Sequence, residues 1–253
     1  MPFAVPPAIT TRKPIFTPGR KVNWEHPLNR GLAAWWLTNE VSGLTVYDVV
    51  ERFPLAYQGT PPGDGNPFST YQGRRALRLD KDNSNYANWG VDPVLSFPLT
   101  LCGWFNVDNI TETHSVLSIG SPSTTNRYIV IAAAGLTTGD PCRAIASTST
   151  AAGASVSASA YTANAWHFLV GVFNSTTSRF CYLNGVPGSE ETTNIGSFPA
   201  CTDMRIGLIC TTGTSYVTGA VDNLSIYRRA LSQEDILSLY SYPYGTPNNP
   251  RLI

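Results

Sequence analysis

The most informative segment lies near the C-terminal end: Gly219-Ala-Val-Asp-Asn-Leu-Ser-Ile-Tyr-Arg-Arg-Ala-Leu-Ser-Gln-Glu-Asp-Ile236. It predicts a strand, a tight connection and a short helix. Because side chains alternate along a strand, one face is predicted to carry Ala220, Asp222, Leu224 and Ile226. Asp222 among apolar neighbours is costly to bury and is expected to pair with a cation or several donors. Ser232 is predicted to cap the helix, with Glu234 and Asp235 in its first turn. The apolar side of that helix is predicted to hold Ile236, Leu237 and Leu239.

This closing pattern resembles the final strand and helix of laminin G-like domains, which are concanavalin A-like lectin/glucanase sandwiches. Earlier blocks resemble the same family in the same order: Gly31–Glu40, Ala76–Tyr86, Leu99–Val107, Asn164–Phe173, Arg179–Gly185 and Met204–Gly207. The resemblance implies an all-β fold, a two-sheet antiparallel jelly-roll sandwich over residues 31–241 with one short C-terminal helix. It leaves the function open, because one fold hosts many functions.

Composition supports a single β domain. The chain has 253 residues, 21 glycines and 19 prolines, which suits one large sandwich with many turns. Charged residues make up 13% of the chain and the formal net charge is zero. This balance argues against electrostatic binding to nucleic acid or to an anionic membrane. The N-terminal sequence does not read as a secretory signal peptide, and the longest apolar runs of the chain are too short to span a bilayer.

The five cysteines, an odd number, have no Cys-x-x-Cys spacing. Folding in a reducing cytosol is the simpler account, because disulfides are rare there. A disulfide between Cys201 and Cys210 is the alternative. Cys102 and Cys181 are expected to act as small buried apolar residues.

Proline-rich segments flank the sandwich. Residues 1–30 are predicted to form an extended arm and residues 242–253 a C-terminal tail, because closely spaced prolines deny both helix and central-strand structure. The arm is too apolar for an ordinary solvated linker and is predicted to anchor on a partner through Phe3, Val5, Ile9, Ile15 and Phe16. The alternative is a disordered tail.

No catalytic pattern is found in the sequence. The Glu-x-Asp-x-Glu strand of glycosidases on this fold is missing, and Glu190 and Glu191 are adjacent, so they point to opposite faces. No Gly-x-Ser-x-Gly elbow, phosphate loop or His/Cys cluster occurs. His114 is predicted in a polar turn, and His167 as a hydrogen-bonded core histidine. We expect no enzyme activity.

Two binding sites are predicted. The family resemblance implies a calcium site at the sandwich rim, formed by Asp80, Asp82, Asn83 and Asp222, since Ca²⁺ prefers oxygen ligands. The alternative is that these residues form Asx-turns and accept backbone N–H bonds. Aromatic residues near turn-rich sequence are candidates for stacking on sugars: Tyr57, Tyr71, Tyr86 and Trp89. Ordinary packing is the alternative for each of them. Trp35, Trp36, Trp104 and Trp166 are predicted to be core residues.

The segments Val22–Leu32 and Leu239–Pro247 resemble laminin G-like proteins encoded among tailed-phage structural genes. This resemblance implies a structural virion protein, made in the host cytoplasm, that decorates a capsid or forms part of a fibre. Its expected partners are the major capsid protein or another virion protein, further copies of itself, and glycans, with no nucleic acid and no membrane. The alternative is a freestanding carbohydrate-binding module.

Overall fold

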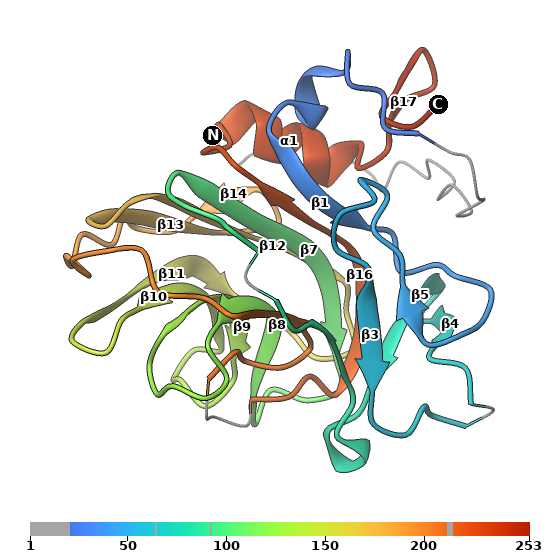
Figure 1. The fold of residues 1–253 in the computed structure, drawn as a ribbon, viewed down its shortest axis with the longest axis horizontal. Coiled ribbons are helices and arrows are strands. Elements are labelled where there is room, and N and C mark those ends of the chain that lie inside the picture. Colours follow the sequence, from blue (N-terminus) through green and yellow to red (C-terminus); the bar gives the residue numbers. More distant parts are fainter. Residues whose placement is uncertain (1–20, 64, 92, 212–214) are drawn as a thin grey trace.

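Two eight-stranded antiparallel sheets pack face to face in the computed structural model, which describes residues 21–63, 65–91, 93–211 and 215–253 (Figure 1). The first sheet has the order β14-β13-β12-β7-β16-β5-β4, with β1 also paired to β16. The second sheet has the order β11-β10-β9-β8-β15-β6-β3-β2. The predicted all-β jelly-roll-like sandwich with one short C-terminal helix is confirmed.

The first sheet consists of β1 (Leu32–Trp36), β4 (Phe68–Tyr71), β5 (Arg74–Leu79), β7 (Leu99–Val107), β12 (His167–Ser175), β13 (Ser178–Leu183), β14 (Val186–Pro187) and β16 (Gly219–Tyr227). The second sheet consists of β2 (Thr45–Val46), β3 (Leu55–Gln58), β6 (Tyr86–Trp89), β8 (Thr113–Gly120), β9 (Tyr128–Ala134), β10 (Pro141–Ser147), β11 (Ala152–Ala160) and β15 (Asp203–Ile206). The remaining elements are the 3-10 turns η1 (Pro27–Asn29) and η2 (Lys81–Asn83), the helix α1 (Gln233–Ser241), and the hairpin β17 (Gly245–Thr246) and β18 (Asn249–Pro250).

The main core lies between the sheets. Alternate residues of β7, such as Leu101 and Phe105, face Ile131 of β9 and Ile206 of β15, and all four are fully buried. Each such side chain contributes about 1.5–3 kcal/mol by leaving water. The central strands β7 and β12 are buried on both faces, as the apolar pattern of residues 166–173 predicts.

A second apolar core covers the outer face of the first sheet. Trp104 and Phe168 on that face pack beneath α1, where the Tyr240 ring stacks on Trp104 at 5.6 Å between centroids. The helix begins with the predicted capping box, since Ser232 and Asp235 bond each other's backbone N–H groups. Its buried side chains are Ile236 and Leu239, whereas Leu237 is 42% exposed and its predicted place on the apolar side is wrong.

The chain ends complete this cover. The lead-in pairs with the C-terminal residues through a Val22–Leu252 bridge, and Figure 1 shows both segments on the same side of the molecule as α1. Residues 21–30 therefore belong to the folded unit rather than to a free arm. Arg251, 1% exposed, donates to Asn29 Oδ1 at 2.9 Å, Pro243 O at 2.7 Å and the Tyr227 hydroxyl at 2.8 Å. The predicted anchoring residues Phe3, Val5, Ile9, Ile15 and Phe16 lie outside the described residues.

A β-bulge interrupts β16. The register between β16 and β7 shifts between Asp222 and Ser225, and Asn223 has a positive φ of 50°. As a result Leu224 faces the main core, whereas Asp222 lies on the outer side, beside Arg74. The predicted common face of Ala220, Asp222, Leu224 and Ile226 is therefore wrong beyond the bulge.

Several local predictions are resolved. Asn184 and Gly185 form the hairpin turn with φ of 53° and 82°, as a type I′ turn requires. All five cysteines are buried free thiols, so Cys201 and Cys210 do not form a disulfide. His114 lies in β8 and is fully buried, so its predicted place in a polar turn is wrong. None of the helices in the described part of the chain has the length and apolar character to cross a membrane.

Candidate functional site

A row of polar side chains crosses the outer face of the second sheet. The backbone register places Asn88 of β6 directly between Ala56 of β3 and Arg205 of β15, and Arg205 opposite Ser118 of β8. Gln58, two residues beyond Ala56 on β3, projects from the same face because side chains alternate. Four neighbouring strands thus bring polar groups to one surface.

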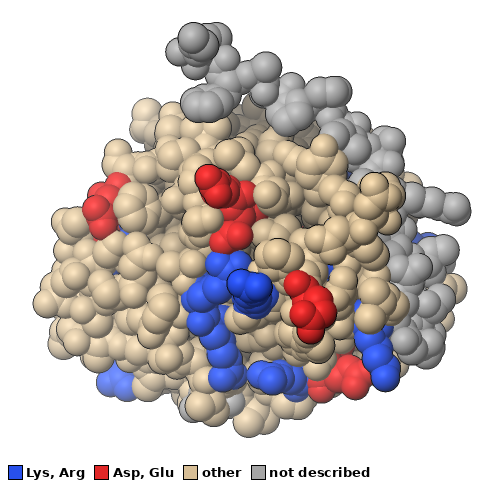
Figure 2. All heavy atoms as spheres, turned by 90° about the horizontal axis from the view of Figure 1, so that it is seen from above, with Lys and Arg blue, Asp and Glu red and all other residues tan. Residues whose placement is uncertain are grey.

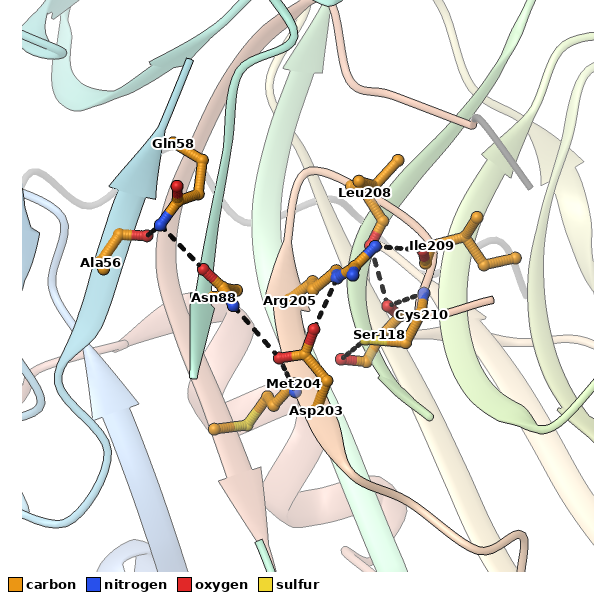
Figure 3. A network of polar contacts seen from close by, with 10 residues as sticks. All are labelled: Ala56, Gln58, Asn88, Ser118, Asp203, Met204, Arg205, Leu208, Ile209 and Cys210. Carbon is orange, nitrogen blue, oxygen red and sulfur yellow. Dashed lines mark hydrogen bonds and ion pairs between the residues drawn. The ribbon is translucent and has the colours of Figure 1, made fainter. Parts of the chain in front are cut away.

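The members of this row bond to one another (Figure 3). Gln58 Nε2 donates to Asn88 Oδ1 at 3.1 Å, and Asn88 Nδ2 donates to Asp203 Oδ1 at 3.5 Å. Arg205 Nε donates to Asp203 Oδ2 at 2.8 Å, and its Nη1 donates to Ile209 O at 3.3 Å. We call Gln58, Asn88, Asp203 and Arg205 the polar row.

Two tyrosines flank the polar row. The rings of Tyr86 and Tyr216 meet edge to face at 6.3 Å, and the Arg205 guanidinium carbon lies 5.2 Å from the Tyr86 ring centroid. Gln58, Asn88, Arg205 and both tyrosines are half-buried, whereas Asp203 is 3% exposed. The surface therefore offers amide donors and acceptors, a positioned cation and aromatic rings, held in place by mutual contacts.

This surface suits uncharged hydroxyl-rich ligands better than strongly charged ones. Asp203 and Arg205 neutralise each other in an ion pair at 2.8 Å. Elsewhere, the face in Figure 2 shows a central band of Lys/Arg side chains with Asp/Glu side chains beside it, on an otherwise uncharged surface. Amide groups with remaining hydrogen-bonding capacity are able to donate to and accept from hydroxyl groups.

The four predicted aromatic residues separate in the structure. Tyr86 lies beside the polar row. Tyr57 is 6% exposed in the main core, where its hydroxyl donates to Arg78 O, so its predicted role on a sugar-binding surface is wrong. Trp89 points inward from β6 and packs edge to face against Phe53, which makes packing its main role.

Tyr71 lies on the other side of the sandwich, at the tip of the β4–β5 hairpin. Its ring meets Trp166 edge to face at 6.4 Å, and the Arg78 guanidinium carbon stands 3.8 Å from its centroid. Its hydroxyl donates to Asp108. Burial, followed by the Asp108 carboxylate, raises the pKa of Tyr71 to about 12, so the hydroxyl stays protonated at neutral pH.

The residues predicted to hold calcium do not come together. Asp80 caps η2, accepting from Asp82 N at 3.0 Å and from Asn83 Nδ2 at 2.8 Å. Asp222 pairs with Arg74 at 3.7 Å and accepts from the Thr38 hydroxyl at 3.3 Å. Since Ala220 pairs with Arg78, Asp222 and Asp80 are about four residues apart along the sheet, roughly 13 Å.

The predicted Asx-turn and hydrogen-bonding roles therefore fit these residues better than a shared metal site. Within the described residues, no group of three or more His, Cys, Asp or Glu side chains is placed to hold a metal ion. Calcium binding itself stays a prediction.

Sequence reasoning missed Gln58, Asn88, Asp203, Arg205 and Tyr216. A local signal was present, because Asp203-Met-Arg-Ile206 alternates polar and apolar residues and so predicts one polar face. The partners of that face come from strands far apart in the chain. Only the register unites them.

Comparisons with known proteins agree with this fold. A family model described as the concanavalin A-like lectin/glucanases superfamily matches residues 81–237, more than half of the chain. No curated protein matches the chain.

Solved structures are similar at low sequence identity. Domain 4 of AbnA, an extracellular GH43 arabinanase from Geobacillus stearothermophilus solved in complex with arabinotriose, has a TM-score of 0.65 at 17% identity, covering 83% of this chain and 98% of that one. Trypanosoma rangeli sialidase has a TM-score of 0.58 at 14% identity, covering 84% of this chain and 33% of the sialidase. These likenesses support the fold, and the family match settles the membership: the chain belongs to the concanavalin A-like lectin/glucanase superfamily.

Proposed function

We propose that this protein is a non-enzymatic carbohydrate-binding module and that the polar row binds a neutral oligosaccharide. The observation that carries the proposal is the line of half-buried amides from Gln58 to Asn88, fixed by Asp203 and Arg205 and flanked by Tyr86. Preorganised amides suit sugar hydroxyls, and an adjacent ring suits the apolar face of a sugar. The fold of an arabinanase domain solved with arabinotriose supports the same class of ligand.

The polar row favours binding over hydrolysis. It holds one carboxylate, Asp203, and both its oxygens accept hydrogen bonds, Oδ1 from Met204 N and Oδ2 from Arg205 Nε. Hydrolysis of a glycosidic bond generally uses two carboxyl groups on one surface, roughly 5–9.5 Å apart. The row alone does not supply that pair.

The test is titration calorimetry with a panel of neutral arabino-, xylo-, gluco- and galacto-oligosaccharides. We expect at least one of them to bind and Asn88→Ala to weaken its binding at least tenfold, because the amide links both halves of the row. Asn248→Ala, at an exposed position on the β17–β18 hairpin, is the matched control and should bind like the wild type. Equal affinity of Asn88→Ala and wild type would refute the site. Release of reducing sugar would refute the non-enzymatic assignment.

We further propose that the module is part of a tailed-phage virion, made in the host cytoplasm, as a capsid decoration or fibre component. The observation that favours this is the position of Lys21, to which the predicted arm is attached. Lys21 pairs with Ile253 on the first-sheet side, away from the polar row. An arm that anchors there to the major capsid protein or another virion protein leaves the polar row free for ligand. Assembly as a homo-oligomer is part of this proposal, which does not require calcium.

Co-sedimentation with capsids that lack the protein tests the virion role. The deletion should remove residues 1–20 only, because residues 21–30 are packed against the sandwich. Stoichiometric binding by the full chain that is lost in the deletion variant is the expected result. Capsid binding that does not need residues 1–20 would contradict anchoring through the arm.

A further inference from the structure

The β4–β5 hairpin crosses part of the outer face of the first sheet. Trp166 Nε1 donates to two carbonyl oxygens of the hairpin tip, Tyr71 O and Gln72 O, each at 3.3 Å. The Tyr71 hydroxyl donates to Asp108, just beyond β7. Gln72 and Gly73 at the tip are exposed and have positive φ of 44° and 80°. These few contacts hold the hairpin tip near the ends of β7 and β12, although β16 separates the hairpin from both strands in the sheet order.

Two buried polar side chains beneath this region have no partner among the described residues. Asn106 is fully buried, and neither its Nδ2 nor its Oδ1 makes a hydrogen bond. Trp104, on the same face of β7, has a buried Nε1–H that is also unpaired. Native proteins pair almost all buried polar atoms, so two such side chains two residues apart on one strand point to a missing ligand.

The neighbouring positions are cationic and aromatic. The Arg74 guanidinium carbon lies 4.0 Å from the Trp104 ring centroid and 5.2 Å from that of Trp166. Ala220 lies between Arg78 and Asn106 in the sheet. Arg78 stacks on Tyr71, and its guanidinium has no hydrogen bond or ion pair within the described ranges.

The unpaired groups are mostly donors: an indole N–H, an amide NH₂ and a guanidinium. The carboxylates nearby are already engaged, Asp222 with Arg74 and Asp108 with Tyr71. A ligand that satisfies these donors brings acceptor oxygens, and the Arg78 guanidinium favours a carboxylate among them. A ligand that packs against Tyr71 and Trp166 also presents a ring face.

We propose that this region is a second binding site, separate from the polar row, which takes the carboxylate of an acidic sugar of the uronic acid class. Arg78 and Arg74 bind the carboxylate, Asn106 and Trp104 Nε1–H bond oxygens of the same sugar, and Trp166 and Tyr71 contact its ring. The hairpin tip at Gln72–Gly73 lifts to admit the ligand.

Titration calorimetry with oligogalacturonate, matched neutral galacto-oligosaccharide and acetate tests the proposal. We expect oligogalacturonate to bind at least tenfold more tightly than either of the others. Arg78→Met should lower this affinity at least tenfold, because it keeps an apolar stem and removes the donors. Arg143→Met, on β10 of the other sheet, is the matched control and should leave it unchanged.

Asn106→Leu separates a binding role from a packing defect. It replaces an unpaired amide by an apolar group of similar size, so the variant should unfold at the same or a higher temperature and yet lose oligogalacturonate binding. Asn88→Ala should leave oligogalacturonate binding intact, so failure at the polar row is distinguished from failure here. The proposal is overturned by wild type that does not bind oligogalacturonate, by acetate or the neutral sugar binding as tightly, or by full binding in both Arg78→Met and Asn106→Leu.

Discussion

The two outer faces of the sandwich handle their polar groups in opposite ways. The first sheet is covered by α1 and the chain ends, so its outward residues form an apolar core in which Arg251 is enclosed. The second sheet leaves its polar row half-buried, and the Arg205 side chain there keeps some contact with solvent. Each arginine has a defined position, but for different physical reasons.

Arg251 shows what enclosure demands. Its three nitrogens each donate to an oxygen, and its guanidinium carbon lies 4.1 Å from the Trp35 ring centroid. Arg205 bonds one carboxylate and one carbonyl and keeps part of its surface in contact with solvent. A buried charge is costly unless it is paired, whereas a charge with some access to solvent retains capacity for a ligand. The comparison therefore predicts stability effects where α1 and the chain ends cover the first sheet, and binding effects at the polar row of the second.

The largest expected effect is at Arg251. Arg251→Met should lower the free energy of unfolding by about 3 kcal/mol, because it leaves buried oxygens of Asn29, Pro243 and Tyr227 without donors and releases the C-terminal segment. Urea denaturation followed by tryptophan fluorescence measures this. Arg143→Met, at a partly exposed position of the second sheet, should change it by less than about 0.5 kcal/mol. Equal effects at the two positions would contradict the contrast between the faces.

A smaller effect is expected at Asp222, on the covered side. Asp222→Ala should lower the free energy of unfolding by about 1–2 kcal/mol, because it removes the hydrogen bond from the Thr38 hydroxyl and the ion pair with Arg74. The ion pair contributes little, because the Arg74 side chain is 35% exposed. Since Arg74 is already its counterion, EDTA should leave the melting temperature of the wild type unchanged. A chelator-sensitive melting temperature that disappears in Asp222→Ala would instead support the calcium prediction.

Much of the fold was predictable because its signals are local. The capping box at Ser232 lies within one helical turn, and the Asn184–Gly185 turn is set by two adjacent residues. The bulge at Asn223 is different. The extra residue is visible only against β7, and Asn223 is stabilised there by accepting from Trp35 Nε1 at 2.5 Å, a partner nearly two hundred residues away. Alternation along β16 is therefore predicted correctly only up to that point.

The candidate sites were less predictable for the same reason. Tyr86 was found from the sequence, but Gln58, Asn88 and Arg205 become neighbours only through the register of β3, β6 and β15. Tyr57 has the same turn-rich surroundings as Tyr86 but the opposite orientation, because in β3 it shares the inward face with Leu55. Aromatic residues near turns therefore predict a rim location only when the strand face is also known.

The second sheet is not open along its whole length. In β8, His114 is fully buried between the Asn109 backbone and the segment at Tyr216–Thr218. Its Nδ1 lies 3.2 Å from Tyr216 O, and its Nε2 lies 3.2 Å from Asn109 O. Burial lowers the pKa of His114 below its ordinary value of 6.5, despite the opposing effects of the hydrogen bonds to the Asn109 and Tyr216 backbone and of the Glu112 and Asp108 carboxylates.

This shift predicts how stability depends on pH. Below pH 6.5 the unfolded chain takes up a proton at His114 that the folded protein excludes. The free energy of unfolding should therefore decrease by up to about 1 kcal/mol as the pH is lowered from 7 to 5.5. Burial lowers the pKa of His26 and His167 as well, so they add to the same slope from the first-sheet side. His114→Gln, which carries no titrating group, should flatten part of the slope in urea denaturation at pH 7, 6.5, 6 and 5.5. If His114→Gln leaves the pH dependence of the free energy of unfolding unchanged, that dependence comes from His26 and His167 on the first-sheet side alone.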